Sequence, residues 1–262
     1  MDRYSDLIEL PSQGRLYDGR LPGGEIEIYA MGVKEEALLI GKDNKLEASR
    51  ALDRLLESCI KTDFPLDDVL MSDRFYILLM IRKISYSPVY TYDIKCPICK
   101  ARFKHTIEIP GSFSVTLLDD GTKEPFFVDL PLCGKRVGFR LLRSSDEKDT
   151  QMYIRNQVRA SKDKITNYGY IYRLAKHVIS IDDIPENPEE NLDEPTKVSV
   201  NESLRFVEML RGGDSSKLKD AIAKCDCGLD TTFNAECVDC GEEFKAGFEF
   251  TPEFFRPESG EV

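Results

Sequence analysis

The chain contains one short pattern twice, as YDIKCPICKARFK at residues 92–104 and as FNAECVDCGEEFK at residues 233–245. In each copy a strand-like run enters a tight Cys-x-x-Cys turn, here called a knuckle, and a second run leaves it. A knuckle places two thiolates on one side of the chain. Two knuckles supply the four sulfurs of a tetrahedral zinc site, with Zn–S distances of roughly 2.3 Å. The pattern therefore predicts a structural zinc bound by Cys96, Cys99, Cys237 and Cys240.

The other cysteines leave an alternative open. Cys225 and Cys227 lie just before the second knuckle and could complete a local four-sulfur site with it. We favour the paired knuckles, because a Cys-x-Cys segment cannot make the same turn and the two Cys-x-x-Cys segments match each other. Cys59, in a helical pattern, and Cys133, beside a turn, are expected to be small buried hydrophobic residues.

The composition is that of a globular protein with an acidic surface. The 262 residues suffice for one large domain or two small ones, and 41% of them are hydrophobic. The formal net charge of −11 repels phosphate backbones, so we expect no nucleic-acid partner. The longest apolar run, residues 75–81, is too short to cross a bilayer, and the first residues do not resemble a signal peptide. Eight cysteines in such a chain favour metal over disulfides.

Periodicity predicts a mixture of strands and helices. Alternation at period two predicts strands at residues 25–30 and 136–141. A helix from Ser72 or Asp73 to Ser85 is apolar all round at its centre, so it should be buried. Further helices are expected at about 34–40, 46–60, 146–160, 167–179, 200–210 and 215–224.

Two helix boundaries carry recognisable end signals. Ser144-x-x-Glu147 is predicted to be a capping box that opens the helix at 146–160. Gly212 and Gly213, followed by Asp214, are expected to stop one helix and to cap the next.

The second half of the chain repeats the order of the first. When Ile26 is aligned with Val137, the predicted strand at 25–30 matches the one at 136–141 in its alternation. When Cys96 is aligned with Cys237, the segments 87–109 and 228–250 share six identities in 23 positions. We infer an internal duplication whose halves pack about a pseudo-twofold axis, so that the two knuckles share one zinc. The alternative is a chance similarity between two β-hairpins.

The predicted fold class is α+β, with two related strand-plus-helices halves joined through a four-cysteine, zinc-ribbon-like unit. Prolines and acidic residues at 182–199 are typical of a solvated loop. The expected parts are an extended N-terminal segment (1–24), a first half (25–110), a connecting β segment (111–133), a second half (134–251, with the acidic loop at 182–199) and a C-terminal tail (252–262).

The sequence offers no catalytic constellation. A catalytic zinc keeps one open position, and four thiolates leave none. The two histidines, His105 and His177, are expected to be structural. No nucleophile elbow, glycine-rich phosphate loop or His-Glu-x-x-His motif is present, so we expect neither an enzyme nor a small-molecule substrate.

A set of short motifs follows one another along the chain: LPSQGRLY at 10–17, MGVKEE at 31–36, Asp73-Arg74, CPIC at 96–99, GLDTT at 228–232, CVDCG at 237–241 and PEFFRP at 252–257. With these motifs the chain resembles the T4-type bacteriophage baseplate hub subunit family over most of its length. Lys100 departs from the family pattern, because a glycine often follows a knuckle where φ is positive. Cys225 and Cys227 are not part of that pattern.

This resemblance implies a non-enzymatic role in building the central hub of the baseplate, as a resident subunit or as an assembly factor. The implied partners are other baseplate hub proteins and tail-tube or tape-measure proteins. The implied location is the host cytoplasm during assembly, or the tail baseplate of the virion.

Both ends of the chain look extended and are expected to dock onto partners. An apolar pair flanked by proline and arginine on an exposed tail is suited to anchor a contact. The alternative is that this pair covers the protein's own core. The residues expected to bind partners are Leu10, Pro11 and Tyr17 at one end and Phe254, Phe255 and Arg256 at the other.

Two other classes of function compete with this one. A zinc-ribbon regulator that binds nucleic acid would need a basic face, and a metallo-hydrolase would need an undetected open metal site. The first knuckle is basic and the second is acidic, which would equally let a basic knuckle meet an acidic partner surface. The residues concerned are Lys95, Lys100, Arg102 and Lys104 around the first knuckle and Glu236, Asp239, Glu242 and Glu243 around the second.

Overall fold

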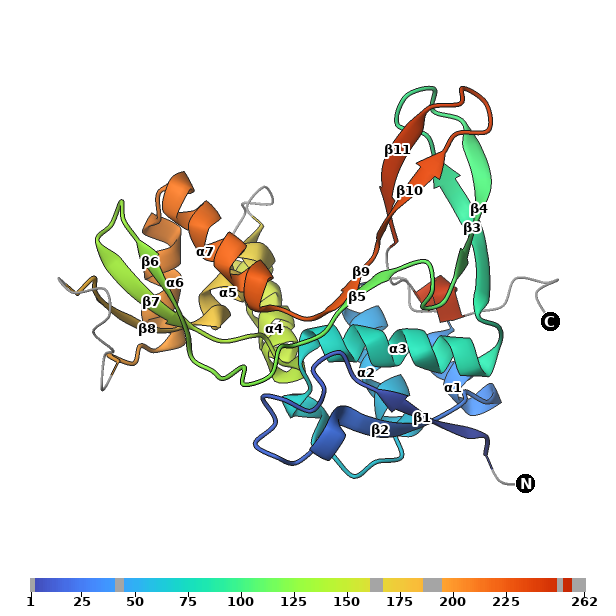
Figure 1. Cartoon of the computed structure of the whole chain (residues 1–262), viewed down its shortest axis with the longest axis horizontal. Helices are drawn as coiled ribbons and strands as arrows, with labels where there is room; N and C mark the ends of the chain where they lie inside the picture. Colours follow the sequence, from blue (N-terminus) through green and yellow to red (C-terminus); the bar gives the residue numbers. More distant parts are fainter. Residues whose placement is uncertain (1–2, 41–44, 161–166, 186–194, 249–251, 256–262) are drawn as a thin grey trace.

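The computed structural model describes residues 3–40, 45–160, 167–185, 195–248 and 252–255. The chain forms two lobes and a pair of β-hairpins that projects from them (Figure 1). We call these parts the N-terminal lobe, the second lobe and the hairpin unit. The mixed α+β class predicted from the sequence is confirmed.

The N-terminal lobe is built around helix α3 (Met71–Ser85). Ile77, Leu78, Leu79 and Ile81 at its centre are fully buried, as the sequence predicts. A helix that is apolar on every side is stable only where other elements cover it. The covering elements are β1 (Ser5–Glu9), β2 (Glu25–Tyr29), α1 (Val33–Leu39), α2 (Lys45–Cys59) and the 3-10 helix η3 (Pro252–Phe255).

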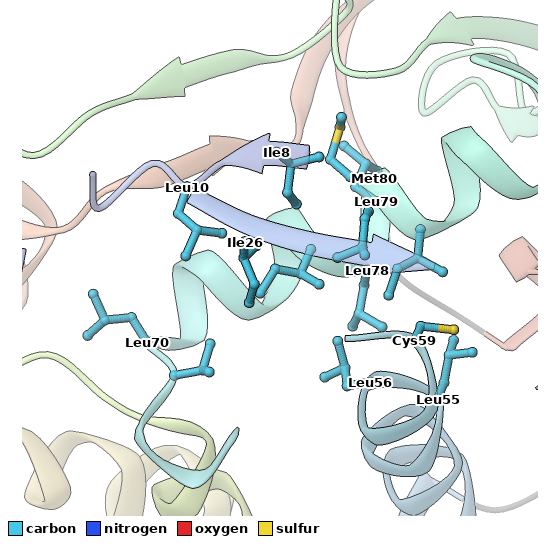
Figure 2. Packing of buried hydrophobic residues seen from close by; sticks show 14 of the residues in the cluster. Ile8, Leu10, Ile26, Leu55, Leu56, Cys59, Leu70, Leu78, Leu79 and Met80 are labelled. Atoms are coloured by element: carbon cyan, nitrogen blue, oxygen red, sulfur yellow. The ribbon is translucent and has the colours of Figure 1, made fainter. Parts of the chain in front are cut away.

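The first residues of the chain are part of this lobe. Strands β1 and β2 pair in antiparallel register, from Ser5 opposite Tyr29 to Glu9 opposite Glu25. Alternate side chains of the pair point toward α3, and Figure 2 shows Ile26 of β2 in the same cluster as residues of α2 and α3. The segment expected to be separate and extended therefore supplies a strand and several core residues.

A buried polar cluster fixes the chain after β1. The Asp73 carboxylate on α3 accepts the Ser12 N–H (3.0 Å) and the Tyr17 hydroxyl (2.6 Å). The same hydroxyl accepts the Leu70 N–H at 2.9 Å. Burial raises the pKa of Asp73, although its hydrogen bonds oppose that rise. The cluster satisfies buried backbone groups at the cost of enclosing a carboxyl group.

Arg82 joins the far end of α3 to the C-terminal segment. Its side chain is fully buried and lies over the rings of Tyr86 (5.0 Å), Tyr90 (5.2 Å) and Phe254 (5.6 Å). The guanidinium also donates to the carbonyl oxygens of Phe254 and Ser87, both at 3.0 Å. A buried guanidinium is stable where aromatic faces and acceptors replace its water.

The second lobe has an antiparallel sheet covered by helices. Its strands lie in the order β6-β7-β8, so β7 is central. The core beneath them includes Val137, Phe139, Leu174 and Leu218. The elements are β6 (Phe126–Leu130), β7 (Lys135–Phe139), β8 (Val178–Asp183), α4 (Ser144–Ala160), α5 (Tyr168–His177), α6 (Val200–Met209) and α7 (Gly212–Cys225).

Strand β8 corrects two sequence-based expectations. The helix expected at 167–179 ends at His177, and residues 178–183 form a strand that pairs with β7. Val178 and Ser180 are buried while Ile179 and Ile181 are partly exposed, which is the alternation of a strand. The acidic loop expected from 182 thus begins inside a strand, and residues 186–194 lie outside the described residues.

The predicted capping box at the start of α4 is wrong. The Ser144 hydroxyl donates to the Val69 carbonyl oxygen (3.2 Å) and does not cap the helix. Asp146 accepts the Arg143 N–H instead, at 2.9 Å. Tertiary contacts decide this competition, because Asp146 is also held by the Arg140 guanidinium at 2.7 Å.

The break between α6 and α7 is predicted at Gly212 and Gly213, two residues beyond its position in the structure. α6 ends at Met209 and α7 already begins at Gly212, with Arg211 as its N-cap. Asp214 lies in the first turn of α7, where its carboxylate accepts the Leu132 N–H from the turn between β6 and β7 (3.1 Å). The residue expected to cap the helix therefore ties the helix to the sheet.

Backbone contacts join the two lobes. The Met71 N–H donates to the Leu142 carbonyl oxygen (2.9 Å), and the Ser144 N–H donates to that of Val69 (2.8 Å). Arg143, between them, forms an ion pair with Glu124 at 2.7 Å. The start of α3 and the start of α4 are thereby fixed to each other.

The hairpin unit comes from two distant parts of the chain. The hairpin of β3 (Val89–Lys95) and β4 (Arg102–Glu108) follows α3, and that of β10 (Thr232–Glu236) and β11 (Glu243–Gly247) follows the second lobe (Figure 1). The chain leaves for the second lobe through β5 (Ser114–Thr116) and returns through β9 (Gly228–Asp230), and these two strands pair with each other.

The Asp73→Asn variant should gain stability relative to the unchanged protein as the pH rises. A carboxyl group whose pKa is raised in the folded state contributes stability below its unfolded pKa of about 4, and this stability is lost as the pH rises through the folded pKa. The asparagine of the variant does not titrate, so the difference in free energy of unfolding should shift in its favour between pH 4.5 and 7, by up to about 1.4 kcal/mol per pH unit. Urea unfolding at both pH values measures it, and a pH-independent difference would contradict it.

Arg82→Met should lower the free energy of unfolding by about 2–4 kcal/mol, because it leaves the buried carbonyl oxygen of Phe254 and the partly buried one of Ser87 without this donor. The matched control is Arg54→Met on the exposed surface of α2, which should change it by less than about 0.5 kcal/mol. Chemical denaturation of both variants provides the comparison, and equal effects would show that Arg82 does not hold the C-terminal segment.

Candidate metal centre

The four cysteines of the two knuckles meet at the tip of the hairpin unit. Their sulfur atoms all lie within 4.8 Å of one another. The Sγ atoms of Cys96 and Cys240 are 3.9 Å apart, and those of Cys99 and Cys237 are 3.5 Å apart. Four ligands at about 2.3 Å around a tetrahedral ion would lie about 3.8 Å from each other. The sulfur positions therefore fit a zinc-sized ion.

The two knuckles have the same backbone hydrogen bonds. In the first, the Cys96 N–H donates to the Ala101 carbonyl oxygen (2.9 Å), and in the second the Cys237 N–H donates to that of Glu242 (3.0 Å). Lys100 and Gly241, at equivalent positions, have φ values of 67° and 69°. The positive φ at Lys100 is the strained conformation that its departure from glycine predicts.

The contacts between the two knuckles are reciprocal. Each sulfur contact joins the first cysteine of one knuckle to the second cysteine of the other. Cys96 and Cys237 are buried, whereas Cys99 and Cys240 are exposed. This reciprocal arrangement is that of a local pseudo-twofold axis passing between the knuckles.

Aromatic pairs continue the same relation below the sulfurs. The rings of Phe103 and Phe244, at equivalent positions of the two hairpins, meet edge to face at 6.4 Å. The rings of Tyr92 and Phe233, which the same alignment pairs, also meet edge to face at 6.4 Å. Sequence identity alone could not reveal the second pair, because its residues differ, but the alignment places them opposite each other. These contacts hold the hairpins together independently of a metal.

The thiols of Cys96 and Cys240 differ in their pKa values. Burial raises the pKa of Cys96, but N–H groups of Cys99 and Ile98 outweigh it and lower the pKa to about 7. The Glu242 N–H favours the Cys240 thiolate, but desolvation and the neighbouring sulfurs raise its pKa to about 12. Four thiols this close cannot all ionise together unless a cation compensates their charge. The donor set is therefore suited to a soft divalent cation.

Cys225 and Cys227 do not join the cluster. Cys225 ends α7 and packs against the core of the second lobe. Cys227 is buried beside α3, with its sulfur 3.3 Å from the Ser72 hydroxyl, and burial raises its pKa to about 12. Over the described ranges, the knuckle cysteines are the one group of three or more His, Cys, Asp or Glu side chains with metal-ligand spacing. The local alternative is therefore not formed.

The remaining cysteines and the histidines lie outside the centre. Cys59 is buried as expected, but Cys133 is exposed, because it lies in the turn between β6 and β7. His105 stacks on Phe233 at 4.7 Å, and burial lowers its pKa. His177 lies 2.7 Å from the Arg140 carbonyl oxygen, and burial lowers its pKa too.

The residues predicted to bind partners are mostly inside the N-terminal lobe. Phe254 and Phe255 are at most 1% exposed and pack against each other at 5.0 Å, which agrees with the alternative that they cover the protein's own core. Their burial corrects the expectation of exposed docking segments, because α3 offers both ends of the chain an apolar surface. Leu10, Pro11 and Tyr17 are buried as well, and Arg256 lies outside the described residues.

None of the helices in the described part is long and apolar enough to span a membrane.

Comparison with known proteins identifies the family of the chain. No curated protein and no solved structure matches the chain. The model of one family, described as T4 bacteriophage base plate protein, matches residues 7–256. Since that match covers nearly all of the 262 residues, the chain belongs to the T4 bacteriophage base plate protein family.

Proposed function

We propose that the protein is a non-enzymatic subunit or assembly factor of the central baseplate hub. The family match over residues 7–256 carries this proposal, because it supports a structural role in the baseplate. In this role the protein acts through contacts with other hub proteins and with tail-tube or tape-measure proteins. It works in the host cytoplasm during assembly, and a resident subunit would remain in the virion tail.

The cysteine cluster of this hub protein binds one structural zinc ion. The cluster joins segments that lie on either side of the entire second lobe, so the ion would fix the return of the chain to its starting point. Structural zinc contributes directly to folding free energy. Four sulfur ligands also leave no open position for a substrate or an activated water, which is why we assign the site a structural role.

The two hairpins and the lobes that precede them derive from an internal duplication. Glu35 accepts the Gly32 N–H at the start of α1 (2.8 Å), as Asp146 accepts the Arg143 N–H at the start of α4. Gly32 and Arg143 are equivalent in the same alignment that matches the predicted strands at 25–30 and 136–141. Each lobe then leads through helices to a knuckle hairpin, which supports common ancestry of the halves over chance similarity.

The Cys96→Ser variant should lose the single zinc ion of the chain. Three thiolates and a hydroxyl bind zinc far less tightly than four thiolates, because the serine hydroxyl stays protonated. The loss should also lower the free energy of unfolding by several kcal/mol, out of the roughly 5–15 kcal/mol of a typical domain. Elemental analysis of the purified protein gives the stoichiometry, and thermal unfolding gives the stability.

The matched control for zinc is Cys225→Ser, which replaces a cysteine outside the cluster and should keep one zinc per chain. Zinc kept by Cys96→Ser and lost from Cys225→Ser would move the site to the C-terminal cysteines. Absence of zinc from the unchanged protein, purified without chelators, would remove the metal from the proposal.

A phage that lacks this protein should form heads but no functional baseplate hubs, and the unchanged gene supplied in trans should restore infectious tails. Cys96→Ser with Cys237→Ser should fail to restore them, whereas Cys133→Ser, at an exposed cysteine away from the cluster, should succeed. Electron microscopy and plaque counts provide the readout. Mass spectrometry of purified virions then separates a resident subunit, which is present, from an assembly factor, which is absent. Normal tails without the protein would contradict the hub role.

A further inference from the structure

The tip of the hairpin unit carries opposite charges at equivalent positions. Lys95 and Arg102 lie opposite each other on β3 and β4, and Glu236 and Glu243 lie opposite each other on β10 and β11. All four side chains are exposed. The alignment of the knuckles pairs Lys95 with Glu236 and Arg102 with Glu243, so the residue pair next to each knuckle has the same place in both hairpins and opposite charge. The next outward pair of the alignment, Lys104 and Lys245, does not differ in charge.

The two charged pairs point away from each other. Along a strand, successive side chains alternate between the two faces. Ile94 and Ala235 are buried between the hairpins, and Phe103 contacts Phe244 there. The neighbouring residues on each strand therefore point outward. We call the outer surface around Lys95 and Arg102 the basic face, and that around Glu236 and Glu243 the acidic face.

These charges do not stabilise the hairpins that carry them. Like charges directly opposite each other on paired strands are destabilising. In the described part of the chain, none of the four side chains forms an ion pair. A contact with an oppositely charged surface outside the chain would relieve the repulsion on both faces.

We propose that hairpin units of successive copies of this chain bind each other head to tail, with the basic face of one copy on the acidic face of the next. Charge complementarity selects a second copy as the occupant, because one chain carries both halves of the contact. Since the faces lie on opposite sides, the contact is heterologous and repeats into a closed ring or an open chain of copies. Ile98 and Val238, 57% and 73% exposed at the same tip, add apolar surface beside the charges.

This contact extends the proposed function by naming one partner in the hub, and it rests on that function only for its biological setting. Phage assembly tests the hub role, whereas association of the purified full chain tests the contact. Either can fail without the other.

Reversing the sign of the charges on one face at a time tests the contact. Lys95→Glu with Arg102→Glu makes both faces acidic, and Glu236→Lys with Glu243→Lys makes both faces basic. In sedimentation velocity at low ionic strength, the unchanged protein should self-associate, and added salt should weaken the association. Each double variant alone should associate at least tenfold more weakly. An equimolar mixture of the two should associate again, because acidic copies then meet basic ones.

The matched control is Lys34→Glu with Lys224→Glu, which changes the net charge as much as the acidic double variant does, at exposed sites outside the hairpin unit, and should associate like the unchanged protein. Zinc content and circular dichroism of every variant separate loss of the contact from loss of the knuckles. The proposal is overturned by an unchanged protein that stays monomeric, by association that persists in either double variant alone, or by a mixture of folded, zinc-equal variants that stays monomeric.

Discussion

The meeting of four sulfur atoms from two knuckles is the constraint on which the rest of the structure depends. Between the knuckles the chain leaves the N-terminal lobe, builds the whole second lobe and returns, with β5 and β9 paired along the way out and back. The approach of Cys96 and Cys240 to 3.9 Å requires that this path closes on itself. The hydrogen bond between the starts of α3 and α4, from Met71 to Leu142, serves this purpose.

Local and periodic signals made much of this predictable from the sequence. The knuckles and the buried helix α3 follow from spacing and composition, and the match between the knuckles favoured the observed cluster over one with Cys225 and Cys227. Strand β8 and the cap of α4 do not, because each is decided by competition. Val178 could continue a helix or begin a strand, and pairing with β7 selects the strand. Ser144 could cap α4, but its hydroxyl binds the Val69 carbonyl oxygen, and the ion pair with Arg140 fixes Asp146 where it accepts the Arg143 N–H.

The two ends of the chain show why apolar segments are hard to assign from sequence. A segment such as Phe254-Phe255 has the same composition whether it anchors a partner or covers its own core. The deciding information lay elsewhere, in Arg82, a charge at the end of the buried stretch of α3. A buried guanidinium must find aromatic faces and acceptors, and the ring and carbonyl oxygen of Phe254 supply both. The core therefore needs the C-terminal segment, so contacts with partners have to use other, exposed surfaces, of which the hairpin tip is one.

In the hairpin unit, some residues are required by the fold and others are not. The fold requires cysteines in the knuckles, a residue that accepts positive φ after each of them, and inward rings that meet their equivalents, such as Phe103 and Phe244. It does not require a charge on the outer faces, where a mixed pair would stabilise each hairpin better than a like pair. Lys95 with Arg102 on one side and Glu236 with Glu243 on the other thus oppose local stability in a coordinated way. Such a pattern is explained by a surface outside the chain, and a second copy offers both of the charges that it needs.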